Sequence, residues 1–294
     1  MIAMTGLKLA CCLLTAAALG AQTPAVSEPP AASEPPRLTN TGAPIRLPFS
    51  CTQEDVRSFG LTCPAEHPCP VYLELSGLGF SGLRIVLSGN LHTDATTLFS
   101  VLLSSDDGGK TWVEPHERIR GGGLEQVQFF DLESGWIAGQ VLGALPRDPF
   151  LLLTRDGGKT WRARPVFSES RVALIEHYHF DSKTHGTMWI DQMQAGEEGD
   201  RYAVLETTNG GESWAVRETS SRPIPRKKTE AASVYRLRAD AASKSYVVEK
   251  QTAKQWERVA SFLVQVGECR EGEVTFLPEP SGTAAETEPQ PKQP

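Results

Sequence analysis

Residues 105–112 read Ser-Asp-Asp-Gly-Gly-Lys-Thr-Trp, and this pattern returns at residues 154–161 (Thr-Arg-Asp-Gly-Gly-Lys-Thr-Trp) and 207–214 (Thr-Thr-Asn-Gly-Gly-Glu-Ser-Trp). The closing tryptophans recur about every 50 residues, which is typical of a repeat architecture. A degenerate fourth copy ends at Trp256, where the preceding residues 251–255 lack the aspartate and both glycines. The chain is therefore predicted to consist of repeated units.

Each copy lies between two strand-like stretches, so it predicts a hairpin turn. In such a turn the Asp carboxylate accepts hydrogen bonds from backbone N–H groups, the glycines adopt positive φ, and the Trp ring covers the apolar side of the hairpin. We therefore expect a structural role, and calcium binding would need more converging oxygen ligands. The key positions are Ser105, Asp107, Gly109 and Trp112, then Thr154, Asp156, Gly158 and Trp161, and finally Thr207, Asn209, Gly211 and Trp214.

A second repeated element lies between these turns. Residues 127–131 (VQFFD) lead to 135–139 (GWIAG), residues 175–181 (IEHYHFD) lead to 186–190 (GTMWI), and residues 234–248 hold a similar pair. Each unit thus reads as four strands in about 50 residues, the size of one propeller blade. The pattern predicts an all-β protein.

These units resemble the Asp-box (BNR) repeat of β-propellers, and they are most similar to the photosystem II assembly/stability factor-like propeller family. That family pairs a GWxxG-type strand with TxDGGxTW turns, and the resemblance covers about residues 70–260. It implies a β-propeller over residues 49–277 with four four-stranded blades joined by Asp-box turns, or five blades if one is short. It also implies a non-enzymatic binding or assembly scaffold that presents its rim loops to a protein or peptide partner, with no cofactor.

The two ends of the chain are predicted to lie outside the propeller. Residues 1–21 read as a signal peptide, because Lys8 precedes an apolar run over residues 9–19 and small residues follow. Residues 22–48 and 278–294 are rich in proline, so we expect a disordered linker and a disordered acidic tail. The protein would then be extracytoplasmic (periplasmic or secreted), with no transmembrane segment after signal removal.

Four cysteines remain after signal removal: Cys51, Cys63, Cys69 and Cys269. An even number in an oxidising compartment suggests disulfides, and four cysteines allow three pairings. Full pairing requires one bridge between the C-terminal Cys269 and the N-terminal three, which would fasten the two ends of the fold together. Their spacing contains no CxxC pair, which argues against zinc.

The net charge of the chain limits the classes of partner that we expect. The formal net charge of -7 leaves no broad basic surface of the kind that sequence-independent phosphate binding needs, so nucleic acid is not expected. Residues 222–228 form the one concentrated basic stretch, either a solvated loop or a docking loop. The connections 142–148 and 222–229 are the expected contact loops. The docking candidates are Arg222, Arg226, Lys227 and Lys228.

Two competing functions are considered. The first is a sialidase-like glycoside hydrolase, since sialidases share the propeller and its turns and grip the substrate carboxylate with three arginines. Arg46 lies in a sequence close to the family's first arginine motif, and Arg171, Arg201 and Arg217 are also present. The second is a cell-envelope structural module that is attached through its flanks.

A metal site and catalytic chemistry are not expected. His177 and His179 alternate along one predicted strand, with His185 nearby, and such a trio could bind zinc or copper. Strand histidines more often pair with carboxylates or face solvent. The sequence therefore assigns no catalytic, cofactor-binding or metal-binding residue, and it leaves the oligomeric state open.

Overall fold

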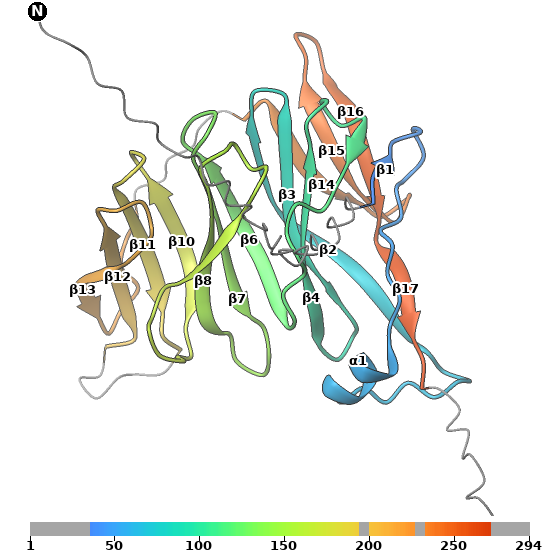
Figure 1. Cartoon of the computed structure of the whole chain (residues 1–294), viewed down its shortest axis with the longest axis horizontal. Coiled ribbons are helices and arrows are strands. Elements are labelled where there is room, and N and C mark those ends of the chain that lie inside the picture. The colour runs from blue at the N-terminus through green and yellow to red at the C-terminus, as the bar shows by residue number, and fades with distance from the viewer. Residues whose placement is uncertain (1–35, 194–199, 227–232, 272–294) are drawn as a thin grey trace, which may run out of the picture. The chain divides into compact units, whose positions relative to one another are not determined.

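The computed structural model describes residues 36–193, 200–226 and 233–271, and these are nearly all β (Figure 1). The described part contains one short helix, α1 (Gln53–Ser58). Its N-terminus has a capping box, in which the Thr52 side chain accepts from the Asp55 N–H and the Asp55 carboxylate accepts from the Thr52 N–H. The predicted all-β class is confirmed. The predicted signal peptide (1–21) and tail (278–294) lie outside the described residues.

Four antiparallel sheets make up the described domain, and we number them by their order along the chain. Sheet 1 contains β17 (Gln265–Cys269), β2 (Cys69–Ser81), β3 (Arg84–His92) and β4 (Thr97–Ser105). Sheet 2 contains β6 (Gly122–Phe129), β7 (Gly135–Val141), β8 (Arg147–Thr154) and β9 (Arg162–Pro165). Sheet 3 contains β10 (Leu174–Phe180), β11 (Gly186–Asp191), β12 (Tyr202–Thr207) and β13 (Ala215–Ser220). Sheet 4 contains β14 (Tyr235–Asp240), β15 (Ser245–Gln251) and β16 (Trp256–Leu263). A further pair joins β1 (Leu38–Thr39) to β5 (Thr111–Trp112).

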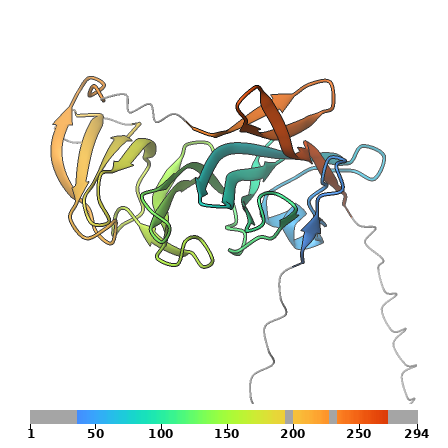
Figure 2. The ribbon, with the colours of Figure 1, turned by 90° about the horizontal axis from the view of Figure 1, so that it is seen from above.

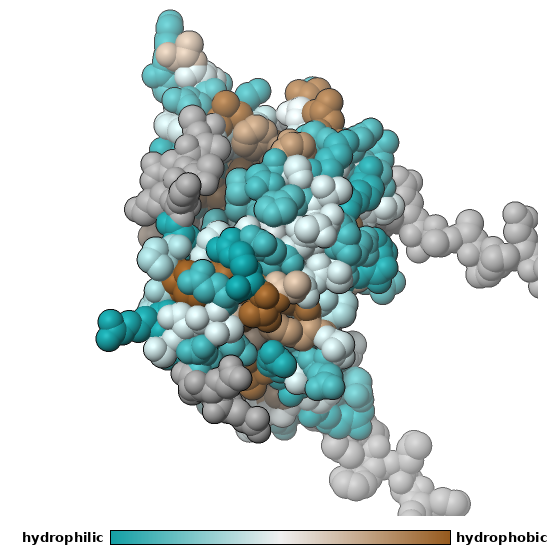
Figure 3. Space-filling model, turned by 90° about the vertical axis from the view of Figure 1, so that its left-hand side faces the viewer, coloured by the Kyte–Doolittle hydropathy of each residue, from teal (hydrophilic) through white to brown (hydrophobic). Residues whose placement is uncertain are grey.

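The sheets pack in the order 4, 1, 2, 3, because three hydrophobic clusters join neighbouring sheets. In Figure 2 the orange-red strands of sheet 4 lie against the blue-green strands of sheet 1, followed by green sheet 2 and yellow-orange sheet 3. None of these clusters of described residues joins sheet 3 to sheet 4. Figure 3 shows the side of the molecule that sheet 3 forms, where hydrophobic residues are interspersed among hydrophilic ones.

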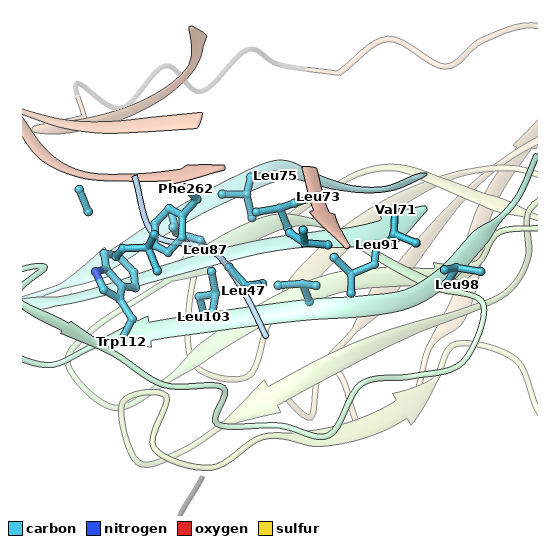
Figure 4. Close-up of a cluster of buried hydrophobic side chains, with 14 of the residues drawn as sticks. Leu47, Val71, Leu73, Leu75, Leu87, Leu91, Leu98, Leu103, Trp112 and Phe262 are labelled. Atoms are coloured by element: carbon cyan, nitrogen blue, oxygen red, sulfur yellow. The ribbon is translucent and has the colours of Figure 1, made fainter. Parts of the chain in front are cut away.

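The largest cluster lies between sheets 1 and 4 (Figure 4). Trp112, from the first repeated turn, packs edge-to-face on Phe262 of β16, with 5.1 Å between ring centroids. Strand β3 is buried along almost its whole length, because sheet 1 is covered on both faces by its neighbours. Each fully buried leucine, such as Leu87, contributes about 1.5–3 kcal/mol of hydrophobic stabilisation.

The domain starts earlier than the predicted boundary at residue 48. Strand β1 pairs with β5, and the Asn40 side chain donates to the carbonyl oxygens of Gly109 and Val259. Ile45 and Leu47 are buried in the core between sheets 1 and 4. The expected disordered linker over residues 22–48 is therefore corrected for residues 36–48, since these two apolar side chains find a core that composition alone does not reveal. Residues 22–35 lie outside the described residues.

Two disulfides join the four cysteines of the described residues. Cys51 is bonded to Cys269, and Cys63 is bonded to Cys69. The first bridge connects the segment before α1 to β17, the C-terminal strand of sheet 1 that pairs with β2. Within the described ranges, no helix has the length and hydropathy of a membrane span.

Candidate functional site

In the first repeated turn, the Asp107 carboxylate accepts hydrogen bonds from residues of the same turn. Asp107 Oδ1 accepts hydrogen bonds from the N–H groups of Lys110 and Thr111, both at 2.9 Å, and Oδ2 accepts from the Thr111 hydroxyl at 2.7 Å. The Trp112 indole N–H donates to Gly109 O at 3.1 Å. Burial alone would raise the pKa of Asp107, but the hydrogen bonds from Thr111, Ser105 and Lys110 outweigh it and lower the pKa to about 2.

The second and third turns repeat this arrangement. Asp156 accepts from the N–H groups of Lys159 and Thr160 at 3.0 Å, and these bonds, with the Thr154 and Thr160 hydroxyls, outweigh burial and lower its pKa to about 2. Asn209 Oδ1 accepts from the Ser213 N–H at 3.0 Å. All three side chains are therefore engaged within their own turns.

A cleft lies between sheets 1 and 2, at the end of the sheets opposite to the first two turns. The turn at residues 105–112 follows β4 beside the β2–β3 hairpin, whereas the cleft lies near the β3–β4 connection and residues 142–144 after β7. It consists of two adjoining cavities of about 570 and 510 Å³. The two share Glu74, Asn90 and Leu142 in their linings.

Two β-bulges shape the wall of this cleft. The β2–β3 register shifts between Leu75 and Gly77, and the β6–β7 register shifts between Leu124 and Val127, a segment that includes Glu125. A bulge inserts an extra residue and redirects the side chains beside it. The sheets approach closely here, because a Cβ on Gly77 would overlap the Glu125 carbonyl oxygen.

Two serine hydroxyl groups of sheet 1 form hydrogen bonds to the backbone of β6 at its bulge. The Ser76 hydroxyl donates to Leu124 O at 2.9 Å, and the Ser88 hydroxyl donates to Glu125 O. Both bonds run from sheet 1 to the backbone of β6. The backbone of β6 is thus held against sheet 1 at Leu124 and Glu125, where the bulge begins.

Glu125 is a half-buried carboxyl group on this wall. Its Oε1 accepts from Gln140 Nε2 at 2.7 Å. Burial raises the pKa of Glu125, the neighbouring Glu74 carboxylate raises it further, and the hydrogen bond from Gln140 offsets part of this effect. The site therefore opposes the ionised form of Glu125.

Asn90, on β3, lines the same cleft, and one of its side-chain atoms has no hydrogen-bond partner among the described residues. Its side chain is buried, with 5% of the residue exposed, and Nδ2 donates to Glu74 Oε2 at 3.1 Å. Since a carboxylate only accepts, this bond fixes the orientation of the amide. The Oδ1 atom is buried and has no hydrogen-bond partner among the described residues.

The cleft is acidic as a whole. Its linings contain Glu74, Asp94 and Glu125, and none of the described residues that line the two cavities is a lysine or arginine. The only histidine there is His92, whose Nδ1 lies 3.1 Å from Thr93 O. The arrangement thus offers hydrogen-bond acceptors and negative charge.

The contact loops named from the sequence lie in two different places. Residues 142–144 line the cleft. Arg226 instead donates to the carbonyl oxygen of Glu176, at the bulge of β10, at 3.3 Å. Arg222 is exposed, and Lys227 and Lys228 lie outside the described residues. Sequence reasoning missed Glu74, Asn90 and Glu125, because acidic and amide residues on separate strands form no spacing motif.

The arginines of the sialidase alternative have separate partners. Arg201 pairs with Asp191 at 2.6 Å, and Arg217 pairs with Glu206 at 2.7 Å. Arg46 donates to the carbonyl oxygen of Gln265 at 3.1 Å. Arg171 packs over the ring of Phe167. These contacts do not bring three arginines to one ligand position.

Of the three histidines named from the sequence, His185 and His177 have different partners. His185 Nδ1 lies 3.0 Å from Asp181 Oδ1, and the His177 ring packs on Trp189 at 5.7 Å. Burial lowers the pKa of His177, and Arg226 and His179 lower it further. Among the described residues, no three His, Cys, Asp or Glu side chains are grouped so that they could hold a metal ion.

Comparisons with solved structures find distant likenesses. The chain is 18% identical to YCF48 bound to D1 peptide (TM-score 0.37, 65% of this chain and 56% of that one). It is 11% identical to an α-L-arabinofuranosidase of Fusarium graminearum with an iminosugar inhibitor (TM-score 0.35, 67% and 62%). It is 14% identical to an α-L-arabinanase of Penicillium chrysogenum with arabinobiose (TM-score 0.34, 76% and 66%). The chain thus spans less than two thirds of each of these structures. No family model and no curated protein matches the sequence.

Proposed function

We propose that this chain is an exported, non-enzymatic binding module of the Asp-box propeller type, with about four blades, that holds an extended segment of a protein partner. The segment binds in the cleft between sheets 1 and 2, beside residues 142–144. The two disulfides support an extracytoplasmic location. The three repeated turns support the propeller type, because each uses its side chain to stabilise a hairpin.

The cleft itself carries the proposal. Its two adjoining cavities form an open trough between sheet ends, and polar side chains from β2, β3 and β6 line it. An extended segment needs hydrogen-bonding partners along its length, and such a trough supplies them. Loops at the ends of sheets generally tolerate variation and often carry binding residues.

A peptide-display experiment tests this function. Random 12-residue peptides displayed on phage are selected on immobilised, oxidised protein, and the selected peptides are titrated by fluorescence anisotropy. Ala144→Trp fills the exposed rim of the cleft, and Ala241→Trp adds the same ring at an exposed turn of sheet 4. We expect roughly tenfold weaker binding for Ala144→Trp only. No selected peptides, or equal binding by both variants, would refute the proposal.

A glycoside hydrolase is the second candidate, and one observation favours it. Glycosidases use two carboxyl groups, one protonated and one ionised, and Glu125 has a raised pKa through burial and the nearby Glu74. A panel of fluorogenic glycosides that includes a sialoside tests this function. Turnover that is lost in both Glu74→Gln and Glu125→Gln, but kept in the exposed control Glu169→Gln, would establish the enzyme and displace the binding module.

A further inference from the structure

We propose that an aromatic pocket beside α1 is the docking site for the C-terminal segment of this same chain, residues 273–279 (Glu-Val-Thr-Phe-Leu-Pro-Glu). In this arrangement Phe276 and Leu277 cover the aromatic rings of the pocket. The pocket is a different surface from the cleft between sheets 1 and 2, so the inference goes beyond the proposed function.

The pocket is an open cavity of about 510 Å³ with an aromatic wall. The Phe99 ring of β4 packs on Phe49, with 6.3 Å between ring centroids, and edge-to-face on Phe59, with 5.5 Å. Phe49 and Phe99 are only partly buried, and both line the cavity. Because contact between apolar surface and water is unfavourable, an apolar segment that covers these rings is stabilised there. The lining residues are Pro48, Phe49, Ser50, Asp55, Phe99 and Arg118.

The charged groups at the pocket favour an acidic segment over a basic one. The buried Asp55 carboxylate is paired with Arg120 at 2.7 Å, and Arg120 also lies over the Phe59 ring, 4.6 Å from its centroid. Arg118 is paired with Glu114 at 2.6 Å. The hydrogen bonds of Arg118 within the described residues use Nε and Nη2, and a guanidinium carries two further N–H donors on Nη1. The pocket therefore suits a segment with an apolar centre and acidic flanks.

Residues 272–294, which follow the described part of the chain, contain one segment of this kind. An apolar run over residues 274–278 (VTFLP) lies between Glu273 and Glu279. Phe276 is the only aromatic residue of 272–294, and no valine, leucine, isoleucine or methionine follows this run. Hydrogen bonds between carboxylates and guanidinium groups are stronger than neutral ones, so the two glutamates match the arginines at the pocket.

The described chain ends close to this pocket. Strand β17 ends beside α1 (Figure 1). The Cα of Cys269 lies 5.0 Å from that of Cys51, which is next to the lining residue Ser50 in the sequence. Phe276 is seven residues after Cys269, and seven residues can span up to about 24 Å. The segment is therefore long enough to reach the pocket from the end of β17.

The N-terminal segment matches the pocket less well. Residues 22–35 contain one large apolar residue, Val26, and no aromatic residue. They precede β1, which pairs with β5 at the first repeated turn, whereas the pocket lies beside α1. Apolar side chains, acidic flanks and a nearby starting point are combined only in the C-terminal segment.

Photocrosslinking in the full, oxidised chain tests the inference. p-Benzoylphenylalanine is incorporated in place of Phe276, or in place of Thr283 as a control in the same tail, and mass spectrometry locates the crosslinks. We expect position 276 to crosslink within its own chain to residues 48–59 or 97–120, and position 283 not to favour them. The absence of these crosslinks from position 276 would overturn the inference. Crosslinked dimers would also overturn it, because they would assign the pocket to a second copy.

Hydrogen exchange measures docking without the probe. The amides of residues 273–277 should exchange roughly tenfold or more slowly than those of a synthetic peptide of residues 270–282. Ser50→Trp fills the exposed rim of the pocket and should restore fast exchange, whereas Ser170→Trp adds the same ring at an exposed serine outside the pocket and should not. Exchange at the rate of the peptide in the parent chain, or equally slow exchange in Ser50→Trp, would show that the segment does not dock there.

Discussion

Glu125 has a carboxyl group whose ionised form the fold disfavours, and this predicts a stability effect. Burial and the nearby Glu74 raise its folded-state pKa above the usual value of 4.5. The folded state therefore holds the proton more tightly than the unfolded state, so this contribution to stability is present at low pH and is lost as pH rises through the raised pKa.

Glu125→Gln should consequently raise the melting temperature at pH 7, and the difference should vanish near pH 4. Thermal unfolding at several pH values measures it, with Glu169→Gln as the matched control. A variant that is less stable than the parent at pH 7 would contradict the account. Replacing a functional side chain often stabilises a protein, because functional sites keep groups that lower the stability of the folded state.

The carboxylates of the repeated turns make stability depend on pH in the opposite direction to Glu125. The pKa values of Asp107 and Asp156 are lowered from 3.8 to about 2, since their hydrogen bonds outweigh burial. Their contribution is therefore present above pH 4 and is lost as pH falls from about 4 to 2.

Asp107→Asn and Asp156→Asn should each lower the free energy of unfolding at pH 7 by on the order of 1 kcal/mol, after solvent screening is allowed for. The loss should disappear near pH 2. The third turn already uses Asn209, so asparagine is compatible with the turn. Urea denaturation at pH 7 and pH 2 measures the difference, with Asp94→Asn as an exposed control. Equal losses at both pH values would show that the charge is not the cause.

At the scale of elements, the close contact between β2 and β6 depends on a glycine, Gly77, which has no side chain. A Cβ at Gly77 would overlap the Glu125 carbonyl oxygen, whereas a Cβ at Gly143 would meet nothing closer than 3.9 Å. Forcing extra atoms into a packed contact typically costs about 1–3 kcal/mol.

Gly77→Ala should therefore destabilise the protein by that amount, while Gly143→Ala should leave its stability unchanged. Urea denaturation of the two variants measures the difference. Gly77→Ala with the stability of the parent would show that the two strands can separate without loss.

At the scale of the whole molecule, the two disulfides should differ in their effect on stability. The cysteines of the Cys51–Cys269 bridge are 218 residues apart, and those of the Cys63–Cys69 bridge are 6 apart. A chain-entropy treatment gives at most about 5 kcal/mol for the long loop and about 2 kcal/mol for the short one.

Replacing Cys51 and Cys269 together by serine should thus lower the free energy of unfolding more than replacing Cys63 and Cys69. Urea denaturation of the two double variants measures this, and peptide mapping without reduction checks the pairing. A larger loss from the short bridge would indicate that β17 stays in sheet 1 without its disulfide.

The packing order of the sheets could not be predicted from the repeats. Units of similar sequence predict similar sheets, but each sheet's neighbours depend on which apolar faces meet. Ile45 and Leu47 illustrate the limit, because they follow a proline-rich stretch and still fill the core between sheets 1 and 4. Composition describes a segment by itself, whereas burial depends on surfaces supplied by distant residues.

The amino-acid sequence alone determined the all-β class and the chemistry of the repeated turns, because a turn is built from hydrogen bonds between residues only a few positions apart. The tertiary structure alone decided the cleft, since Glu74, Asn90 and Glu125 come from three strands and two sheets. The two sheets approach closely at Gly77, and the burial and the nearby Glu74 that raise the pKa of Glu125 arise only in the folded chain. The charge and burial of a site depend on which residues are neighbours in space. The spacing of residues along the sequence does not reveal these neighbours.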